Sequence, residues 1–394
     1  MPNDYRNDPA YHEYLTFFEQ VYVKMQQEYY FPIKREDFQK FIYVFNTKIY
    51  AQLKETGKSS NFIKWRSAAY LVEALRNPED IFSAFFPPKA AEKYEKEVLG
   101  QKIDLGIEGH LTDQGFLISR LEPRADAFEK GLHEQDLLLK IDAADVTTLT
   151  EEKINELLTP LENTTVALHY RDHTDQQEKT IEVISKEYFK QTVFLVPVDV
   201  PHVFCLQIPK FNRATAEDLT RFMQHILEQG DSSLILDLRG NPGGPPLAAR
   251  EISAFFLKPK EEFAYFQRKD RPKSSLDVPE IPPAYHYSGD LVILVNKESG
   301  SASELFTGIL QQRGRATVMG INTAGQVFLK SMFYFDDNSM VLLVTARGFH
   351  PDGTVFSFQG VEPNVRKEVE GDELIHFAAE YLAGKRNDKA DQPR

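Results

Sequence analysis

Two stretches of the sequence decide the fold: LILDLRGNPGG at Leu234–Gly244 and LVILVNKESGSASELF at Leu291–Phe306. Each starts with a short apolar run, which predicts a buried strand, and continues into a turn of small residues. The second turn leads into a helical pattern that begins near Leu305. Such turns present side chains at strand ends, so Ser301 is our candidate nucleophile.

Working outward, strand and helix patterns alternate from residue 188 to residue 386, which predicts an α/β core with a largely parallel sheet. The segment Lys258–Tyr287 is rich in Pro, Lys, Arg and Asp, and we expect an exposed excursion there. The last eight residues, 387–394, are predicted to form a flexible tail.

The part before the core divides in two. Residues 1–98 show aromatic residues at helical spacing and predict a helical N-terminal region whose aromatic stripes form a core. Residues 99–187 show short apolar runs that predict a small β-rich domain. The expected fold class is therefore α/β multidomain, with three units.

Composition excludes several function classes. The 394 residues carry a formal net charge of -13, which argues against a nucleic-acid or anionic-membrane partner, because both require a basic face. The single cysteine, Cys205, excludes an internal disulfide and a cysteine-rich zinc site, and its apolar surroundings predict a core position. We predict no metal, no cofactor, no membrane span and no export signal at the N-terminus as written.

The glycine turn offers backbone N–H groups to an anion, because glycine tolerates positive φ and leaves these groups unshielded. Three interpretations of this turn remain open: it is a phosphate site, half of an oxyanion hole, or only a tight connection between two elements. Gly243-Gly244 is followed by Pro245-Pro246 rather than Lys-Ser, which weakens the phosphate reading. Ser301 precedes a helix, so Ala302 N–H is a further candidate donor to the oxyanion. A serine at this position would also suit a plain helix cap.

At these residues the chain resembles the C-terminal processing peptidases, also called tail-specific proteases. Their nucleophile motif, Asn-Glu-Gly-Ser-Ala-Ser-Ala-Ser-Glu, stands in register with Asn296–Glu304 and puts the nucleophile at Ser301. The run LDLRGNPGG is the family's other hallmark, and it implies that Gly243 or Gly244 supplies the second oxyanion N–H. The resemblance implies a core of the ClpP and crotonase type and cleavage near the C-termini of polypeptides.

The β-rich segment resembles a PDZ domain in its run PRADAFEKGLHEQDLLLKIDAADV. The usual glycine before Asp136 is Gln135, which departs from the pattern. Asp104, Leu105, Gly106 and Ile107 match the loop that captures a peptide C-terminus through successive N–H groups. The other reading is a structural β-domain that binds nothing.

The family's general base is missing from its usual place. A lysine is expected 25 residues after the nucleophile, where this chain has Gln326, and the family's glutamine four residues later is Lys330. A glutamine amide cannot accept the serine proton. Lys330 is therefore either a base in exchanged position, oriented by Gln326, or an ordinary solvated lysine, because four extended residues span roughly 13 Å unless the strand is bulged or bent.

Two functions follow. The first is a serine peptidase that captures substrate C-termini on the PDZ-like domain. The second is a catalytically silent relative that binds polypeptides or a partner. A non-peptidase acyl enzyme and a base among His202, His225 and His350 are weaker options. Self-association through the helical region is a further option, and the family resemblance suggests the cell envelope.

Overall fold

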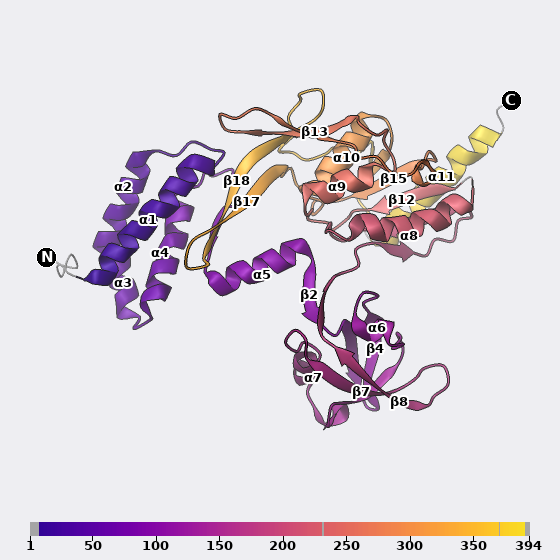
Figure 1. Cartoon of the computed structure of the whole chain (residues 1–394). Helices are drawn as coiled ribbons and strands as arrows, with labels where there is room; N and C mark the ends of the chain where they lie inside the picture. The colour runs from indigo at the N-terminus through magenta and orange to yellow at the C-terminus, as the bar shows by residue number, and fades with distance from the viewer. Residues whose placement is uncertain (1–7, 231, 370, 391–394) are drawn as a thin grey trace.

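The computed structural model describes residues 8–230, 232–369 and 371–390. Figure 1 shows a helical bundle at the N-terminus, a separate β-rich unit, and an α/β unit that ends the chain. Helix α5 (Pro88–Leu99) leads from the bundle toward the β-rich unit. The predicted combination of helical region, β-rich domain and α/β core is confirmed, while the residue boundaries of the units stay predictions.

The N-terminal bundle is built on aromatic residues. Asp8 starts the first helix by accepting Ala10 N–H, and Tyr14, Phe18 and Met25 are buried along one face, as the stripe predicts. The buried cluster of the bundle continues into the strand pair described below, so the bundle packs on the core unit. Its elements are α1 (Pro9–Glu28), α2 (Arg35–Val44), a π-helical turn (Phe45–Ile49), α3 (Tyr50–Glu55) and α4 (Ser60–Leu75).

The β-rich unit is a sheet in the order β3-β4-β5-β7-β8, with β3 at one edge. Gln135, the departure from the PDZ pattern, has φ 74°, so it adopts the left-handed conformation that the usual glycine supplies. Asp136 beside it is fully buried. The elements are β3 (Ile107–Thr112), β4 (Gly115–Leu121), α6 (Asp126–Glu129), β5 (Leu137–Ile141), β6 (Ala144–Asp145), a 3₁₀ turn (Val146–Thr148), α7 (Glu151–Leu157), β7 (Thr165–Arg171) and β8 (Glu178–Ile184).

A strand pair and a buried ion pair are among the contacts that join this unit to the core. A two-stranded ribbon, β2 (Gln101–Asp104) with β9 (Lys186–Phe189), forms the connection. Arg124 then pairs with the buried Asp218 of α8 (Thr215–Glu228) at 2.7 Å. Asp218 also accepts Thr192 N–H at 2.7 Å, so one carboxylate holds the connecting strand and the β-rich unit together.

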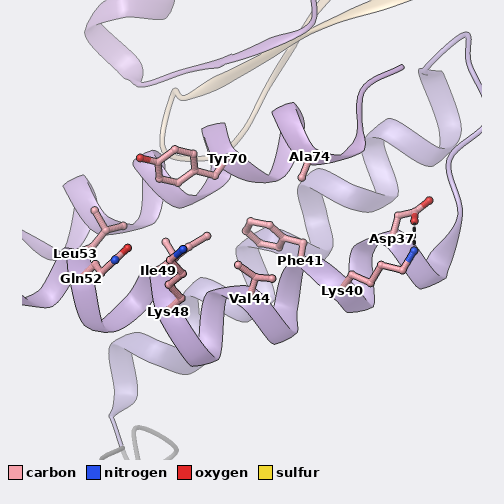
Figure 2. Close-up of a pocket in the computed structure, with 10 residues that line it drawn as sticks. All are labelled: Asp37, Lys40, Phe41, Val44, Lys48, Ile49, Gln52, Leu53, Tyr70 and Ala74. Carbon is pink, nitrogen blue, oxygen red and sulfur yellow. Dashed lines mark hydrogen bonds and ion pairs between the residues drawn. The ribbon is translucent and has the colours of Figure 1, made fainter. Parts of the chain in front are cut away.

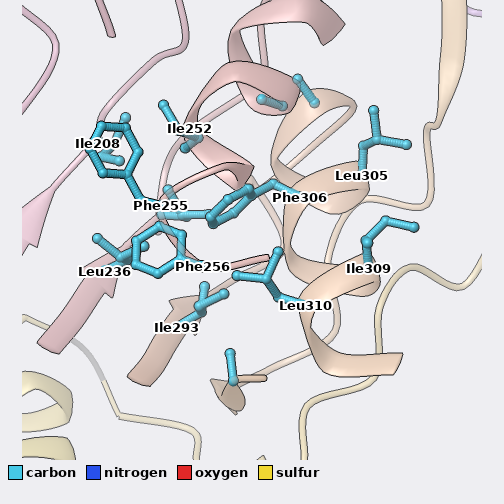
Figure 3. Close-up of a cluster of buried hydrophobic side chains, with 14 of the residues drawn as sticks. Ile208, Leu236, Ile252, Phe255, Phe256, Ile293, Leu305, Phe306, Ile309 and Leu310 are labelled. Carbon is cyan, nitrogen blue, oxygen red and sulfur yellow. The ribbon is translucent and has the colours of Figure 1, made fainter. Parts of the chain in front are cut away.

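The core sheet has the order β10-β11-β12-β15-β16-β19 and is parallel except for β10. Helices α8, α9 (Pro246–Ser253) and α10 (Ala302–Gln312) cover one face, and Figure 3 shows Phe256 and Phe306 within that layer. Helix α11 (Asp372–Ala390) covers the other face. The strands are β10 (Phe194–Val196), β11 (Val203–Gln207), β12 (Ser233–Asp237), β15 (Leu291–Val295), β16 (Thr317–Gly320) and β19 (Val365–Arg366).

A second, antiparallel sheet was not predicted. It joins the strand before α5 to the last part of the core and carries β17 on one side of β18. The expected exposed excursion Lys258–Tyr287 is wrong in part, because it contributes two strands, with Phe263, Ala264 and Phe266 buried, and a short 3₁₀ turn (Pro283–Tyr285). The strands are β1 (Ala84–Phe86), β13 (Glu262–Arg268), β14 (Ser274–Asp277), β17 (Phe328–Tyr334) and β18 (Met340–Phe349).

The remaining predictions concern single features. Cys205 is buried in β11, as expected, and burial raises the pKa of its thiol to about 12. Helix α11 runs to Ala390, so residues 387–390 are helical, and residues 391–394 of the expected tail lie outside the described residues. Residues 1–7 also lie outside them. No helix in the described part of the chain combines the length and apolarity that a membrane crossing requires.

Candidate active site

The two turns of the opening stretches meet at the carboxyl ends of neighbouring strands. β12 and β15 pair in register, with Asp237 opposite Leu294, so the chain leaves both strands at one edge of the sheet. Gly300 N–H then donates to Asn241 O at 2.9 Å, which ties one turn to the other. A Cβ atom on Gly243 would lie only 2.8 Å from Ser301 Cβ, so this approach requires glycine.

Ser301 stands at the N-terminus of α10 in a strained conformation. Its φ is 54° and its ψ is -112°, which is unusual for any residue except glycine. It is half-buried and forms a capping box with Glu304. The partial positive charge of the helix end therefore lies beside the Ser301 side chain.

The neighbouring serines are structural. Ser299 Oγ donates to Leu238 O at 2.8 Å, and Ser303 Oγ donates to Asn241 O at 3.0 Å. Both side chains are fully buried. The alternation of serines thus gives two that bind the glycine turn and one, Ser301, that lies at the surface of the turn.

Two backbone donors beside Ser301 remain unoccupied. Gly243 N–H donates to Asn241 Oδ1 at 2.8 Å, and Ser301 N–H donates to Glu304 Oε2 at 2.8 Å. Within the described residues, Gly244 N–H and Ala302 N–H have no hydrogen-bond partner. Of the predicted oxyanion residues, Gly244 and Ala302 therefore offer free donors in this conformation, whereas Gly243 does not.

Gln326 lies close to Ser301. Its backbone N–H donates to Glu304 Oε2 at 2.8 Å, the same oxygen that accepts Ser301 N–H. The position that carries the family's lysine is therefore beside Ser301 in this chain also, but it presents an amide. An amide has no basic nitrogen, so it cannot serve as the general base.

Lys330 lies elsewhere. Its Nζ is 4.3 Å from the centre of the Phe82 ring, and no described residue gives it an ion pair or hydrogen bond. Burial lowers the pKa of the Lys330 ammonium, and the Asp80 carboxylate partly opposes this shift. The sheet register does shift between Leu329 and Lys330, but the extra residue, Thr345, is on β18. β17 therefore has no extra residue between Gln326 and Lys330 in this pairing, and nothing in the described contacts brings Lys330 to Ser301.

The three histidines considered as alternative bases are all placed away from the serine. His350 stacks on Phe356 at 3.8 Å and lies against Gly308, about two turns along α10 from Ser301. Burial lowers the pKa of His350. His225 is exposed on α8 with its ring against Phe204, and His202 occupies a turn with φ 60°.

The PDZ-like loop binds its own N–H donors in this structure. Gly106 N–H donates to Asp104 Oδ1 at 2.8 Å, and Leu105 N–H donates to Leu158 O at 3.1 Å. The Asp104 carboxylate also accepts the Tyr188 hydroxyl, and burial followed by the charge of Asp104 raises the pKa of Tyr188. A cavity of about 140 Å³ lies here, lined by Gly106 and Ile107 and by charged residues including Lys102, Arg120 and Glu122.

One group in the described part of the chain has donor atoms close enough for a metal ion: Asp136, Asp172 and His173, within 4.8 Å of one another. These donors are already used. Asp136 accepts His133 N–H and His173 N–H, while Asp172 pairs with the Lys179 ammonium at 2.6 Å. A cation would meet that ammonium, so we assign no metal to this group.

Sequence reasoning missed two residues that organise the site. Glu304 is fully buried and binds both the nucleophile turn and the turn at Gln326. Asn241 accepts from Gly243 and donates to Ile208 O at 2.7 Å. Each had a sequence signal: a glutamate three residues after a helix-capping serine, and an asparagine two residues before a glycine.

With this geometry in hand, comparison with known proteins identifies the family. Residues 202–367 match the sequence profile of Peptidase family S41, and residues 90–171 match that of the PDZ domain. The core unit thus resembles Peptidase family S41, and the unit before it resembles the PDZ domain. The S41 match contains both turns, Ser301 and Gln326, and the predicted family is thereby confirmed.

Curated relatives of this S41 chain carry the name probable CtpA-like serine protease. The protein from Staphylococcus haemolyticus is 25% identical over 315 residues, which cover 78% of this chain and 62% of the relative. One from Staphylococcus aureus is 24% identical over 325 residues, covering 78% and 61%. The chain thus spans a little over three fifths of the length of these relatives.

Solved structures share the fold of this S41 chain. The photosystem II D1 C-terminal processing protease superposes with a TM-score of 0.52 at 18% identity, over 92% of this chain and 95% of that one. The tricorn protease superposes with a TM-score of 0.58 at 14% identity, over 95% of this chain and 37% of that one. At these identities the likeness establishes the fold alone.

Proposed function

We propose that this chain is a serine peptidase that cleaves polypeptides near their C-termini, with Ser301 as the nucleophile. The observation that carries the proposal is the pairing of Ser301, at the N-terminus of α10, with the free N–H groups of Gly244 and Ala302. This arrangement suits a reaction in which negative charge develops on a carbonyl oxygen next to a serine.

The chemistry follows from these groups. Ser301 Oγ attacks the substrate carbonyl carbon while its proton moves to a general base. The resulting oxyanion accepts hydrogen bonds from Ala302 N–H and Gly244 N–H. The base returns the proton to the leaving amine as the C–N bond breaks, which leaves an acyl-enzyme that water then hydrolyses.

Lys330 is our proposed base, with Gln326 orienting it. Burial already lowers the pKa of Lys330, which favours the neutral amine that a base requires. The amine lies on Phe82 in this conformation, so the dyad requires Lys330 to leave that ring when substrate binds. The PDZ-like loop, Asp104–Ile107, would deliver the substrate by capturing its C-terminus.

A second candidate function is polypeptide binding without catalysis. The specific observation in its favour is that Gln326, rather than a lysine, shares the Glu304 carboxylate oxygen with Ser301. A silent relative would keep the two turns and the PDZ-like domain and lose only turnover.

Labelling with a fluorophosphonate probe separates the two functions. In the peptidase, the native chain is labelled and both Ser301→Ala and Lys330→Ala lose labelling. In a silent relative, the native chain is not labelled and Gln326→Lys restores labelling. Labelling that survives Lys330→Ala would show that Lys330 is not the base.

The pH dependence gives an independent test of Lys330. Because a base must be neutral, the labelling rate should rise with pH through an apparent pKa below that of an ordinary lysine. In Lys330→Gln this limb should disappear. If the labelling rate instead rises around the ordinary pKa of lysine, burial does not lower the pKa of the base, which contradicts the proposal.

We also propose that the helical region mediates self-association. A groove of about 420 Å³ lies on the helical region, and its lining includes Phe41, Val44, Tyr70 and Lys40, whose side chains Figure 2 shows. Tyr43, one helical turn from Lys40, is 70% exposed. A projecting ring beside an apolar groove suits a two-fold pair, in which each copy supplies both parts.

Light scattering on the full chain tests this pairing. Tyr43→Asp should convert a dimer to a monomer, while Leu161→Asp, at a leucine 85% exposed on the β-rich unit, should not. A monomeric native chain would contradict the pairing. The family resemblance further leads us to propose the cell envelope as the compartment, which fractionation of the source cells would test.

A further inference from the structure

Glu304 makes more contacts than a helix cap requires. Its side chain is fully buried, and Oε2 accepts Ser301 N–H and Gln326 N–H, both at 2.8 Å. Oε1 accepts the Thr323 hydroxyl at 2.6 Å and Gly325 N–H at 2.5 Å. A capping box accounts for only the first of these four bonds.

The four donors come from two separate turns. One is the nucleophile turn; the other, residues 323–326, follows β16 and leads to the strand that carries Lys330. Among described residues, no lysine or arginine pairs with Glu304, so hydrogen bonds alone stabilise its charge. A carboxylate has about four acceptor positions, and all of them are filled here.

The second turn is itself held in place around this carboxylate. Ala324 N–H donates to Ser299 O at 3.0 Å, and the Thr323 hydroxyl accepts Val361 N–H at 2.6 Å. The loop that follows β18 is therefore also linked to Glu304 through Thr323. The carboxylate sits at the centre of three segments that are distant in sequence.

We propose that Glu304 is a positioning residue that fixes the strained Ser301 turn against the turn that carries the base position. Its charge is essential, because a neutral amide has one acceptor oxygen and would direct its NH₂ group toward donors. Loss of the carboxylate would leave up to four buried donors unpaired and release both turns together. The effect on catalysis rests on the proposed peptidase function, whereas the coupling of the turns does not.

Hydrogen exchange on the full chain tests the coupling without any need for activity. In Glu304→Gln, amide exchange should rise at least tenfold in residues 299–303 and also in residues 323–327, and remain unchanged in the β-rich unit and the bundle. If exchange becomes faster only in residues 299–303, Glu304 acts as a helix cap and does not couple the two turns. Unchanged exchange in both segments would overturn the proposal.

Thr323→Val serves as a milder variant in case Glu304→Gln destabilises the whole core. It removes one of the four donors and leaves the carboxylate in place, so exchange should rise in 323–327 with no general loss of protection. The matched control is Glu298→Gln, an exposed carboxylate in the nucleophile turn, which should change neither segment.

Probe labelling adds the catalytic readout. In Glu304→Gln the maximal labelling rate should fall at least tenfold while the probe concentration for half-maximal rate stays within twofold, because the nucleophile is misplaced and the other residues that contact the probe are unchanged. Glu304→Asp, which retains the charge, should recover part of the rate. An unlabelled native chain would refute the peptidase function, but the exchange result would still decide the coupling.

Discussion

Two glycine turns in this molecule are proposed to receive an anion, and they differ in one side chain. In the core turn, Asn241 Oδ1 accepts the N–H of Gly243 at 2.8 Å. In the PDZ-like loop, Asp104 Oδ1 accepts the N–H of Gly106 at the same distance. Both are Asx turns in which a side chain binds the backbone two residues later. The core turn has a neutral amide at this place, and the PDZ-like loop has a carboxylate.

The difference shows that a glycine motif defines the path of the backbone but not which donors are free. After Asn241 and Gly243, Gly244 N–H is still available to an oxyanion. In the PDZ-like loop, Leu105 N–H and Gly106 N–H are both occupied, and a negative charge already stands where a peptide carboxylate would arrive. If the two turns bind anions as we propose, the core turn has a free donor for its anion, whereas the PDZ-like loop has to give up its own hydrogen bonds first.

The largest effect is expected from breaking the core turn with Gly243→Ala. A Cβ atom there would lie 2.7 Å from Gly300 O and 2.9 Å from Ala302 N, and the φ of 101° is strained for alanine. We expect probe labelling of Ser301 to fall about a thousandfold, because both oxyanion donors and the nucleophile are displaced. The labelling rate, measured beside the melting temperature, checks this.

Gly240→Ala is the matched control for that substitution. Gly240 also has a positive φ, 74°, but the nearest atom to its added Cβ, Glu298 Oε2, is 3.8 Å away. It should therefore lose about 1 kcal/mol of stability and keep its labelling rate within a few fold. Equal losses in the two variants would mean that backbone strain, and not the approach to Ser301, limits the site.

The second largest loss of probe labelling is expected when the core turn receives a negative charge like that of Asp104 in the PDZ-like loop. Asn241→Asp should lower the labelling rate about a hundredfold, because a carboxylate beside the oxyanion opposes the charge that develops there. Asn241→Ala, which removes both hydrogen bonds of the side chain without adding charge, should lose less. If the alanine variant is the slower of the two, the main role of residue 241 is to accept Gly243 N–H, which aspartate still does, and not to keep the turn neutral.

The reciprocal exchange, Asp104→Asn, should make the PDZ-like loop more like the core turn. Removal of the like charge should tighten binding of a peptide with a free C-terminal carboxylate about fivefold, since two charges about 4 Å apart in water interact by about 1 kcal/mol. Fluorescence anisotropy in a Ser301→Ala background measures this without cleavage. The amidated peptide should show no change, and equal tightening of both peptides would contradict the charge argument.

The sequence predicted much of this arrangement because the deciding features are local. Apolar runs and small-residue turns predict β12, β15 and the start of α10, and the motif around Ser301 predicts the nucleophile. Gln135 shows the same: its place in the PDZ pattern predicts a turn, and the left-handed backbone there is retained without glycine. These predictions depend on neighbours within a few residues.

What could not be predicted depends on contacts between distant segments. Glu304 appears as a helix-capping residue in the sequence, and only the folded chain brings Thr323, Gly325 and Gln326 to it. Lys330 is four residues from Gln326, but its direction is fixed by Phe82, which is about 250 residues away in sequence. Long-range packing, and not spacing, decides which side chains can meet the nucleophile.

The smallest effect concerns Lys102, whose Nζ lies 3.4 Å from Asp104 Oδ2 in a partly exposed pair. Exposed pairs contribute only about 0.2–1 kcal/mol, so Lys102→Gln should weaken binding of the carboxylate peptide about twofold, and less at high salt. In the Asp104→Asn background the ammonium is no longer held by Asp104 and is free to meet the peptide carboxylate, so the same substitution should cost more. A double-mutant cycle measures the difference. If the loss of affinity is no larger in that background, Lys102 pairs only with Asp104 and does not contact the peptide. The peptide carboxylate is then recognised by other groups that line the cavity, and Arg120 is the next residue to test.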